Sequence, residues 1–189
     1  MNVPKFAPPP AMPKLTPPQL RVRLKRIKLL LFDVDGVLTD GAIYITSEGE
    51  FKRFHVHDGL AQRLASHAGL KVGWVSARPS AITTRRGEEL KTDFIVQTRD
   101  GKVPAVERIL AETGLGWAAA CFVGDDIVDL GVLRRVGLAI SPADGRPEAK
   151  ALAHFVTKAT GGNGCVRELV EMILKAQGKW ATVVAEHAK

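Results

Sequence analysis

The sequence contains little cysteine and no long apolar run. No stretch reaches the 18 or more consecutive apolar residues typical of a membrane-spanning helix, so we expect no membrane partner. The two cysteines, Cys121 and Cys165, lie 44 positions apart, without the close spacing of a metal-binding pair. Cys121 falls inside the apolar run AAACFV, which favours a small buried side chain. Because nothing requires an oxidising compartment, we expect a cytoplasmic protein.

Acidic residues are absent from the first 28 positions. Seven of the 27 lysines and arginines lie in this segment, and removing them leaves 20 basic residues against 20 acidic ones. The net charge of +7 therefore belongs to the N-terminal segment, while the remainder of the chain is neutral. A neutral body offers no basic face to a phosphate backbone, so we do not expect nucleic acid as the main partner.

Proline is concentrated at the N-terminus, where residues 1–19 hold seven of the eleven prolines. Proline fixes φ and removes a backbone donor, so we predict an extended or disordered basic arm over residues 1–19. The arm lacks the unbroken apolar core of a secretory signal. It also contains no serine, which disfavours a transit peptide. Thr16 followed by Pro17 is typical of a helix start and indicates a short peripheral helix leading into the first strand. We predict one domain over residues 20–178 and a C-terminal tail over residues 179–189.

The stretch 27–40, IKLLLFDVDGVLTD, carries the strongest chemical signal. Its apolar residues are typical of a strand that is buried on both faces. The strand ends on Asp33 and Asp35, and burying two like charges is costly unless a cation compensates them. In open α/β sheets, the carboxyl ends of the strands form the ligand crevice. Asp33 and Asp35 therefore indicate a site that holds a hard cation.

Strand and helix patterns alternate along the rest of the chain. Two β-prone runs flank the turn SEGE, which predicts a hairpin over residues 41–54, either a flap beside the crevice or an oligomer contact. Further strands are predicted at residues 72–76, 93–96, 118–123, 138–140 and 154–156. Helices are predicted near residues 58–68, 80–90, 103–113, 147 and 166–176. This order predicts an α/β fold with a mainly parallel, three-layer, Rossmann-like sheet.

Polar side chains follow several of these predicted strands. Ser76 ends the second strand, Lys102 lies in the loop after the third, and Asp125 follows the fourth. Because the carboxyl ends of parallel strands share one edge of the sheet, we expect these groups to meet the two aspartates of the first strand. Asp129 stands four residues after Asp125, so both side chains can face one side of a helix start, where Asp129 would orient Lys102 or metal-bound waters. Asp126 either caps that helix or belongs to the site.

The motif DVDGVLTD, followed in order by a strand-end serine, a lysine and an acidic cluster, resembles the four motifs of the haloacid dehalogenase-like (HAD) phosphatases. The resemblance covers roughly residues 27–178. It implies that Asp33 is a nucleophile that forms an aspartyl-phosphate, and that Asp35 is the general acid and base. It also implies Mg²⁺ bound by the Asp33 and Asp125 carboxylates and the Asp35 backbone carbonyl. Ser76 and Lys102 would hold the phosphoryl oxygens.

Within these phosphatases, no large insertion follows the first motif, so we expect a member without a cap domain. The phrases DVDGVLTDG, FHVHDG, GDDIVDL and GGNGCVRE resemble the 3-deoxy-D-manno-octulosonate 8-phosphate (KDO 8-phosphate) phosphatases of lipopolysaccharide synthesis. This implies a Mg²⁺-dependent homotetramer whose hairpins pack together and whose C-terminal segment closes a neighbour's site. Arg78 would contact the substrate carboxylate through paired hydrogen bonds. Gly161 and Gly162, with Gly164 and Arg167, would belong to the closing segment or else form a turn before the last helix.

Some positions depart from that family. His57 stands where the family usually has arginine, and Ser-Ala-Arg at residues 76–78 replaces its Thr-Gly-Arg. The serine keeps the hydroxyl, whereas His57 bears on the choice of sugar and leaves a sialic-acid-type 9-phosphate as the nearest alternative substrate. A nucleic-acid 3′-phosphatase, motivated by the basic arm, and a non-catalytic homologue are alternatives of other classes. A His55–His57 metal pair is disfavoured because carboxylates already supply the oxygens that Mg²⁺ prefers. Asp58 is predicted to cap the following helix, with a ligand role as the alternative.

Overall fold

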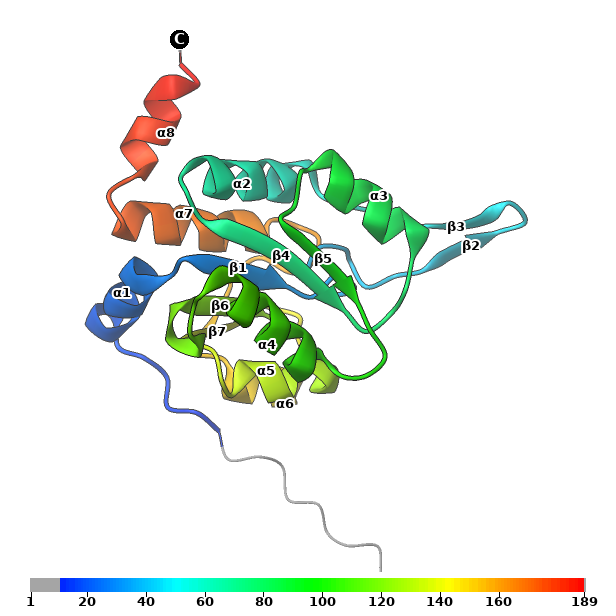
Figure 1. Cartoon of the computed structure of the whole chain (residues 1–189), viewed down its shortest axis with the longest axis horizontal. Coiled ribbons are helices and arrows are strands. Elements are labelled where there is room, and N and C mark those ends of the chain that lie inside the picture. The colour runs from blue at the N-terminus through cyan, green and yellow to red at the C-terminus, as the bar shows by residue number, and fades with distance from the viewer. Residues whose placement is uncertain (1–10, 189) are drawn as a thin grey trace, which may run out of the picture.

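A parallel sheet forms the centre of the molecule. The computed structural model describes residues 11–188, so the first ten residues of the predicted arm lie outside the described residues. The strand order is β5-β4-β1-β6-β7-β8, and all pairings in this sheet are parallel (Figure 1). The predicted mainly parallel α/β sheet is confirmed. Its strands are β1 (Leu29–Phe32), β4 (Lys71–Ser76), β5 (Phe94–Gln97), β6 (Ala120–Val123), β7 (Leu138–Ser141) and β8 (Phe155–Val156).

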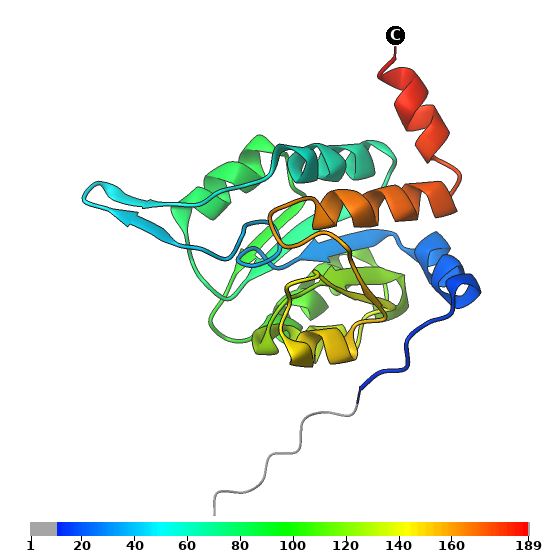
Figure 2. The same cartoon turned by 180° about the vertical axis from the view of Figure 1, so that it is seen from behind.

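Helices cover both faces of the sheet and complete the three predicted layers (Figures 1 and 2). One face carries α1 (Pro17–Arg26), α2 (Val56–His67), α3 (Ala81–Glu89) and α7 (Cys165–Ala176). The other carries α4 (Lys102–Thr113), α5 (Leu130–Leu133) and α6 (Pro147–Leu152). The predicted helix starts and stops hold at two clear places. The Thr16 N–H donates to the Gln19 side chain at 2.9 Å in front of Pro17, and Gly114 ends α4 with φ of +65°.

Strand β1 lies in the middle of the sheet because every one of its side chains is buried. Leu30 and Phe32 point into the core beneath α2 and α7, while Leu29 and Leu31 point into the core beneath α4 and α5. Successive side chains alternate across the sheet, so a strand covered on both sides must be apolar at every position. Each such side chain contributes about 1.5–3 kcal/mol on burial. The apolar run therefore fixes β1 centrally and brings the residue after it to the middle of the sheet edge.

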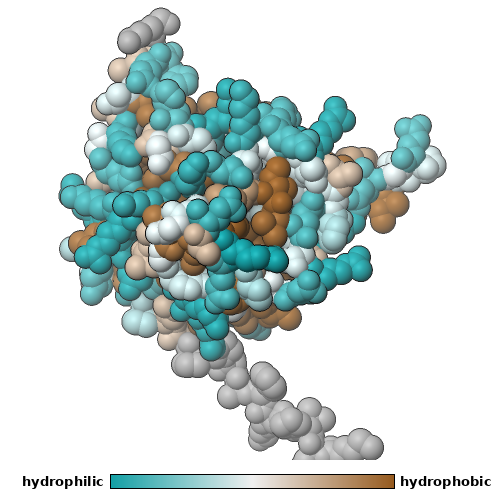
Figure 3. Space-filling view, in the orientation of Figure 1, coloured by the Kyte–Doolittle hydropathy of each residue, from teal (hydrophilic) through white to brown (hydrophobic). Residues whose placement is uncertain are grey.

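The predicted hairpin is confirmed as β2 (Tyr44–Thr46) and β3 (Gly49–Phe51), which pair antiparallel. It projects away from the sheet beyond α3 (Figure 1). The rings of Tyr44 and Phe51 stack with centroids 4.7 Å apart, which stiffens the ribbon. Ile45 is 81% exposed and Phe51 is 51% exposed, and hydrophobic side chains are visible on the projecting ribbon in Figure 3. An exposed apolar ribbon of this kind is typical of a contact surface.

A further helix, α8 (Trp180–Glu186), follows α7 in the segment that the sequence indicated only as a tail. The cationic groups of Arg167 and Lys175 lie 5.1 Å and 5.3 Å from the centre of the Trp180 ring. These cation–π contacts attach the start of α8 to α7. Among the described residues, no helix combines the length and apolarity needed to cross a membrane.

The predicted role of Asp58 as the cap of its own helix is wrong. His55 occupies the N-cap position of α2, and Asp58 lies inside its first turn with 1% of its surface exposed. Its two carboxylate oxygens accept hydrogen bonds from the backbone N–H of Gly164 at 3.0 Å and of Arg167 at 2.8 Å. Asp58 therefore caps α7, a helix more than 100 residues further along the chain. Burial raises the pKa of the Asp58 carboxyl, although the two amide hydrogen bonds favour its charged form.

Replacing Asp58 with alanine should lower the free energy of unfolding by about 2–3 kcal/mol, because two buried amides at the start of α7 lose their acceptor. Asp58→Asn, which keeps one acceptor oxygen, should cause a smaller loss. Urea unfolding followed by circular dichroism measures both. Asp100→Ala, at an exposed loop position, serves as the control. Equal stability of Asp58→Ala and the wild-type protein would show that water replaces the carboxylate at no cost.

Candidate active site

The site forms at the carboxyl edge of the sheet, where β1 runs directly into Asp33. The Asp33 N–H donates to the Val123 carbonyl at 3.0 Å, so the residue continues the pairing of β1 with β6. The residue is only 6% exposed. One carboxylate oxygen, Oδ1, accepts from the Val34 N–H at 2.7 Å and lies 2.7 Å from the Lys102 Nζ. Asp33 is therefore a rigidly held, largely buried carboxylate.

Lys102 bridges two of the site's carboxylates. Its Nζ lies 2.7 Å from Asp33 Oδ1 and 2.6 Å from Asp129 Oδ1, and 3% of the residue is exposed. The sequence placed Lys102 in a loop, but it is the first residue of α4, directly after Gly101 with φ of +92°. Burial alone would lower the pKa of the Lys102 ammonium, yet the two carboxylates together raise it. Lys102 is thus a fixed positive charge beside Asp33.

Three carboxylates gather around this lysine. Asp33, Asp125 and Asp129 each offer an oxygen, and these oxygens lie within 4.8 Å of one another. Burial raises the pKa of Asp33 to about 7, with the Asp129 charge adding to it, and burial with the Asp33 charge raises the pKa of Asp125 to about 8. Asp125 Oδ1 is buried and has no hydrogen-bond partner in the described part of the chain. An excess of negative charge with an unsatisfied oxygen fits a hard divalent cation such as Mg²⁺.

Asp129 organises the loop that carries Asp125. Its Oδ2 accepts from the Asp125 N–H at 3.0 Å and from the Asp126 N–H at 3.3 Å, while its Oδ1 contacts Lys102. The Asp126 side chain accepts from the Ile127 N–H at 2.6 Å and caps the short 3₁₀ helix η2 (Ile127–Asp129). The arrangement therefore favours the cap interpretation of Asp126, and it places Asp129 where it orients both Lys102 and Asp125.

Asp35 does not join the carboxylate cluster but turns its side chain toward Lys52. The Lys52 Nζ lies 2.8 Å from Asp35 Oδ1 and 3.0 Å from Oδ2, and it also donates to the Thr83 hydroxyl at 3.2 Å. The Lys52 side chain is fully buried at the base of the hairpin. Sequence reasoning missed Lys52. The only signal for it was a single lysine inside the run EFKRF, which is otherwise consistent with an exposed strand end.

Ser76 is the last residue of β4, which pairs with β1, and Arg78 lies in the turn that follows it. The Ser76 hydroxyl accepts from the Arg78 N–H at 3.1 Å, which shapes the turn between them. The Arg78 guanidinium pairs with both oxygens of Glu50 from the hairpin, and the Ser80 hydroxyl donates to Glu50 at 2.9 Å. Hydrogen bonds from Arg78 and Ser80 hold the pKa of Glu50 below its ordinary value. Glu50 was also missed, because nothing local distinguishes it from a solvated turn residue.

The glycine segment lies against the loop that follows Asp33. A Cβ on Gly161 would stand 1.9 Å from the Gly36 carbonyl oxygen, and a Cβ on Gly162 would stand 2.4 Å from the Asp40 nitrogen. The Gly162 N–H donates to the Val37 carbonyl at 2.9 Å. These contacts support the loop that follows Asp33, so they favour a packing turn over direct substrate contact for both glycines.

His55 and His57 lie at the start of α2, with ring centres 5.1 Å apart and edge to face. The His55 Nδ1 is 3.8 Å from Asp58. Among residues 11–188, the group of side chains that could hold a metal ion consists of Asp33, Asp125 and Asp129 and includes neither histidine.

Known proteins resemble this chain closely. No family model matches it. The chain is 35% identical over 163 residues to a 3-deoxy-D-manno-octulosonate 8-phosphate phosphatase of Salmonella typhimurium. The aligned region covers 86% of this chain and 87% of the relative. The crystal structure of such a phosphatase from Moraxella catarrhalis, in complex with magnesium, phosphate and KDO, matches with a TM-score of 0.88 at 36% identity, over 91% of this chain and 99% of that one. A HAD subfamily III A hydrolase from Legionella pneumophila matches with a TM-score of 0.87 at 34% identity, over 90% of this chain and 94% of that one.

Proposed function

Because the chain belongs to the KDO 8-phosphate phosphatase family of HAD subfamily III A and is a phosphatase, we propose that it hydrolyses a sugar-acid phosphate, KDO 8-phosphate, with Mg²⁺ as its cofactor. The main support for this function is the cluster at the edge of the sheet, where Lys102 lies between Asp33 and Asp129 and the Asp125 carboxylate is adjacent. The cluster supplies a nucleophile, a fixed cation and an oxygen set for a metal ion. We place the enzyme in the cytoplasm, in lipopolysaccharide precursor synthesis.

In the proposed reaction, an Asp33 carboxylate oxygen attacks phosphorus and the bond from phosphorus to the sugar oxygen breaks. Asp35, which must be protonated at the start of the reaction, gives its proton to the departing sugar oxygen. Asp35 then takes a proton from water, whose oxygen attacks the aspartyl-phosphate and releases phosphate and Asp33. Lys102 and the Ser76 hydroxyl hold the phosphoryl oxygens. Mg²⁺, held by the carboxylates of Asp33 and Asp125 and the Asp35 backbone carbonyl, would neutralise phosphoryl charge.

Lys52 is expected to position Asp35 for both proton transfers. Lys52→Met should lower kcat by about 100-fold with little change in KM, since a proton donor that loses its orientation loses most of its contribution. Lys52→Arg should recover part of the loss. Steady-state kinetics with a sugar phosphate measures both. Lys71→Met is a matched control, because Lys71 also contacts an aspartate at 2.7 Å but is 56% exposed on the opposite edge of the sheet. A wild-type kcat in Lys52→Met would show that Lys52 does not position Asp35 for proton transfer.

Magnesium binding should weaken as the pH falls through the range 8 to 6. The pKa values of Asp33 at about 7 and Asp125 at about 8 mean that protons compete with the metal in this range. In the unfolded chain both groups ionise near pH 4, so the metal-free fold loses stability as pH rises from about 4 to 8. The increase in Tm caused by Mg²⁺ should therefore be larger at pH 8.5 than at pH 6. Calorimetry at both pH values tests this, and an equal increase would contradict it.

The choice of substrate rests on Arg78, which we propose contacts the sugar's carboxylate. Glu50 occupies the Arg78 guanidinium in this structure, so the substrate carboxylate must replace Glu50 there. A Mg²⁺ phosphatase assay should therefore rank KDO 8-phosphate above a sialic-acid-type 9-phosphate and above neutral sugar phosphates. Arg78→Lys should raise KM for the acidic sugars more than for the neutral ones. Preference for a neutral sugar phosphate would overturn the proposed substrate while leaving the phosphatase chemistry intact.

We further propose a homotetramer assembled through the hairpin. The apolar side chains of Ile45 and Phe51 are exposed on that ribbon, and association would remove them from water. Sedimentation equilibrium should give four times the chain mass. Ile45→Lys should shift the protein toward smaller species, and a monomeric wild-type protein would refute the assembly.

A further inference from the structure

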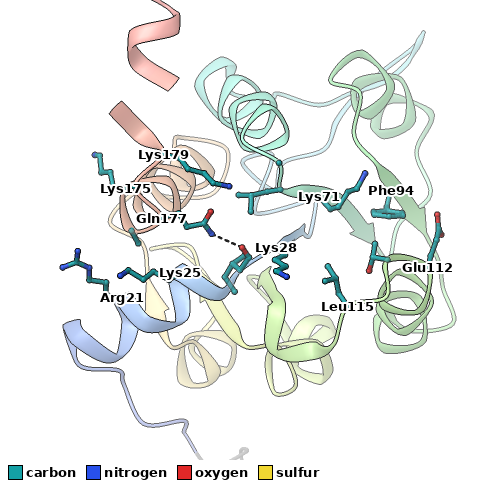
Figure 4. A pocket seen from close by; sticks show the side chains of 16 residues that line it. Arg21, Lys25, Lys28, Lys71, Phe94, Glu112, Leu115, Lys175, Gln177 and Lys179 are labelled. Carbon is teal, nitrogen blue, oxygen red and sulfur yellow. Dashed lines mark hydrogen bonds between the residues drawn. The ribbon is translucent and has the colours of Figure 1, made fainter. Parts of the chain in front are cut away.

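A second hollow lies at the opposite, amino edge of the sheet (Figure 4). Its volume is about 1180 Å³, at or slightly above the range of about 300–1,000 Å³ typical of small-molecule sites. Its walls are the α1 helix, the end of α7, the residues that open β1 and β4, and the end of α4. From Lys28 to Asp33 the strand advances about 16 Å, so this hollow is separate from the carboxylate cluster.

The lining of this hollow is strongly cationic. Six lysine or arginine side chains face it against one acid, Glu112. They come from segments far apart in the sequence and are distributed around the hollow in Figure 4. The cations are Arg21, Lys25, Lys28, Lys71, Lys175 and Lys179. Three of the six belong to the first 28 residues, which carry the excess positive charge of the chain. Part of that excess charge therefore lies beside this hollow.

Three of these cations already have partners. Lys71 contacts Asp93 at 2.7 Å, Lys175 contacts Glu171 at 2.7 Å, and Lys179 donates to the Ala68 carbonyl at 2.6 Å. Arg21, Lys25 and Lys28 make no side-chain hydrogen bond or ion pair with the described residues and are exposed. Gathering unpaired like charges around a hollow is unfavourable without an anion, because each raises the local positive potential.

The hollow also has apolar surface between the cations. Ile27 and Leu70 are buried beside it, and Phe94 and Leu115 are partly buried on its far wall. Figure 4 shows Phe94 and Leu115 on the side opposite Arg21 and Lys25. A ligand for such a site has several negative charges at one end and an uncharged part that covers apolar surface.

We propose that this hollow, which we call the basic pocket, binds a small molecule that carries two or more phosphate groups. Arg21, Lys25 and Lys28 contact the phosphates, and the apolar wall accepts the remainder of the ligand. The cations surround one open hollow and do not form an extended basic stripe, so the arrangement suits a small molecule better than a polynucleotide. The basic pocket does not depend on the proposed phosphatase substrate, since it uses none of the residues of the carboxylate cluster.

Calorimetric titration of the full chain tests the basic pocket, with ATP and inorganic tripolyphosphate as probes in Mg²⁺-free buffer at low ionic strength. Without Mg²⁺, the carboxylate cluster repels these anions, so binding there is suppressed. Both probes should bind, and ATP should bind more tightly because its base covers the apolar wall. Lys25→Gln/Lys28→Gln should weaken both by about tenfold or more, equivalent to about 1.4 kcal/mol. Phosphatase activity and Tm should remain at wild-type values.

Arg26→Gln/Arg134→Gln is the matched control, because it removes the same charge from exposed positions outside the basic pocket. Equal weakening by both pairs would show diffuse attraction and overturn the site. Failure of ATP or of tripolyphosphate to bind would also overturn the site. Tripolyphosphate binding as tightly as ATP would refute the contact with the apolar wall. A single-stranded oligonucleotide that binds more tightly than ATP and displaces it would refute a small-molecule site.

Discussion

Replacing Asp33 with asparagine should reduce phosphatase turnover by about 10⁴-fold or more, because the amide oxygen cannot form the acyl-phosphate bond that the proposed reaction requires. The same change should leave the fold intact. In the absence of metal, the buried Asp33 charge is unfavourable, as its pKa of about 7 indicates. Asparagine removes that charge and keeps an acceptor for the Val34 N–H, so metal-free stability at pH 8 should equal or exceed that of the wild type. Turnover assays and urea unfolding in EDTA measure the two effects.

Asp100→Asn makes the same carboxylate-to-amide change at an exposed position near the site and should keep full activity. Asp33→Ala guards against deamidation of the asparagine variant back to aspartate, and mass spectrometry checks the residue. Substantial turnover by Asp33→Ala would remove Asp33 as the nucleophile. The Mg²⁺-induced rise in Tm should also shrink in both variants, which separates a lost metal ligand from a misfolded protein.

Replacing Lys102 with methionine should be harmful to both stability and activity. The ammonium is the only cation that an ion pair joins to Asp33 and Asp129 among the described residues, at 2.7 Å and 2.6 Å. Its loss leaves buried carboxylates uncompensated, so the free energy of unfolding in EDTA at pH 8 should fall by about 3–5 kcal/mol. Turnover should fall by about 10³-fold, since the proposed reaction requires the Lys102 charge to hold the phosphoryl group. Urea unfolding and kinetics with saturating Mg²⁺ measure the two effects.

The pH dependence separates this electrostatic effect from simple loss of packing. Because protonation neutralises the carboxylates, the deficit of Lys102→Met should shrink as the pH falls from 8 to 5. Lys28→Met, at an exposed position before β1, should change neither quantity. A stability deficit that is constant across this pH range would show that Lys102 acts through packing alone.

Local patterns in the sequence determined the main elements and the principal acidic residues. The run LLLF identified a strand buried on both faces, and the structure places it in the centre of the sheet. Asp33 directly follows β1, Ser76 ends β4 and Asp125 lies two residues after β6. These positions placed the three residues on one edge, since parallel strands share the direction of their ends. Hydrophobic periodicity, strand ends and helix stops depend on neighbouring residues, so they can be predicted from the sequence before the fold is known.

The partners of those residues were decided only by the tertiary structure. Lys52 meets Asp35 across 17 residues, Glu50 meets Arg78 across 28, and Asp58 caps a helix that begins more than 100 residues later. The grouping of Arg21, Lys25 and Lys28 with Lys71 and Lys179 around one hollow is likewise invisible in the order of the chain. A charged side chain can pair with any opposite charge that packing brings within about 4 Å. Which partner comes within that distance depends on how the helices and the hairpin pack on the sheet, and no local pattern specifies it.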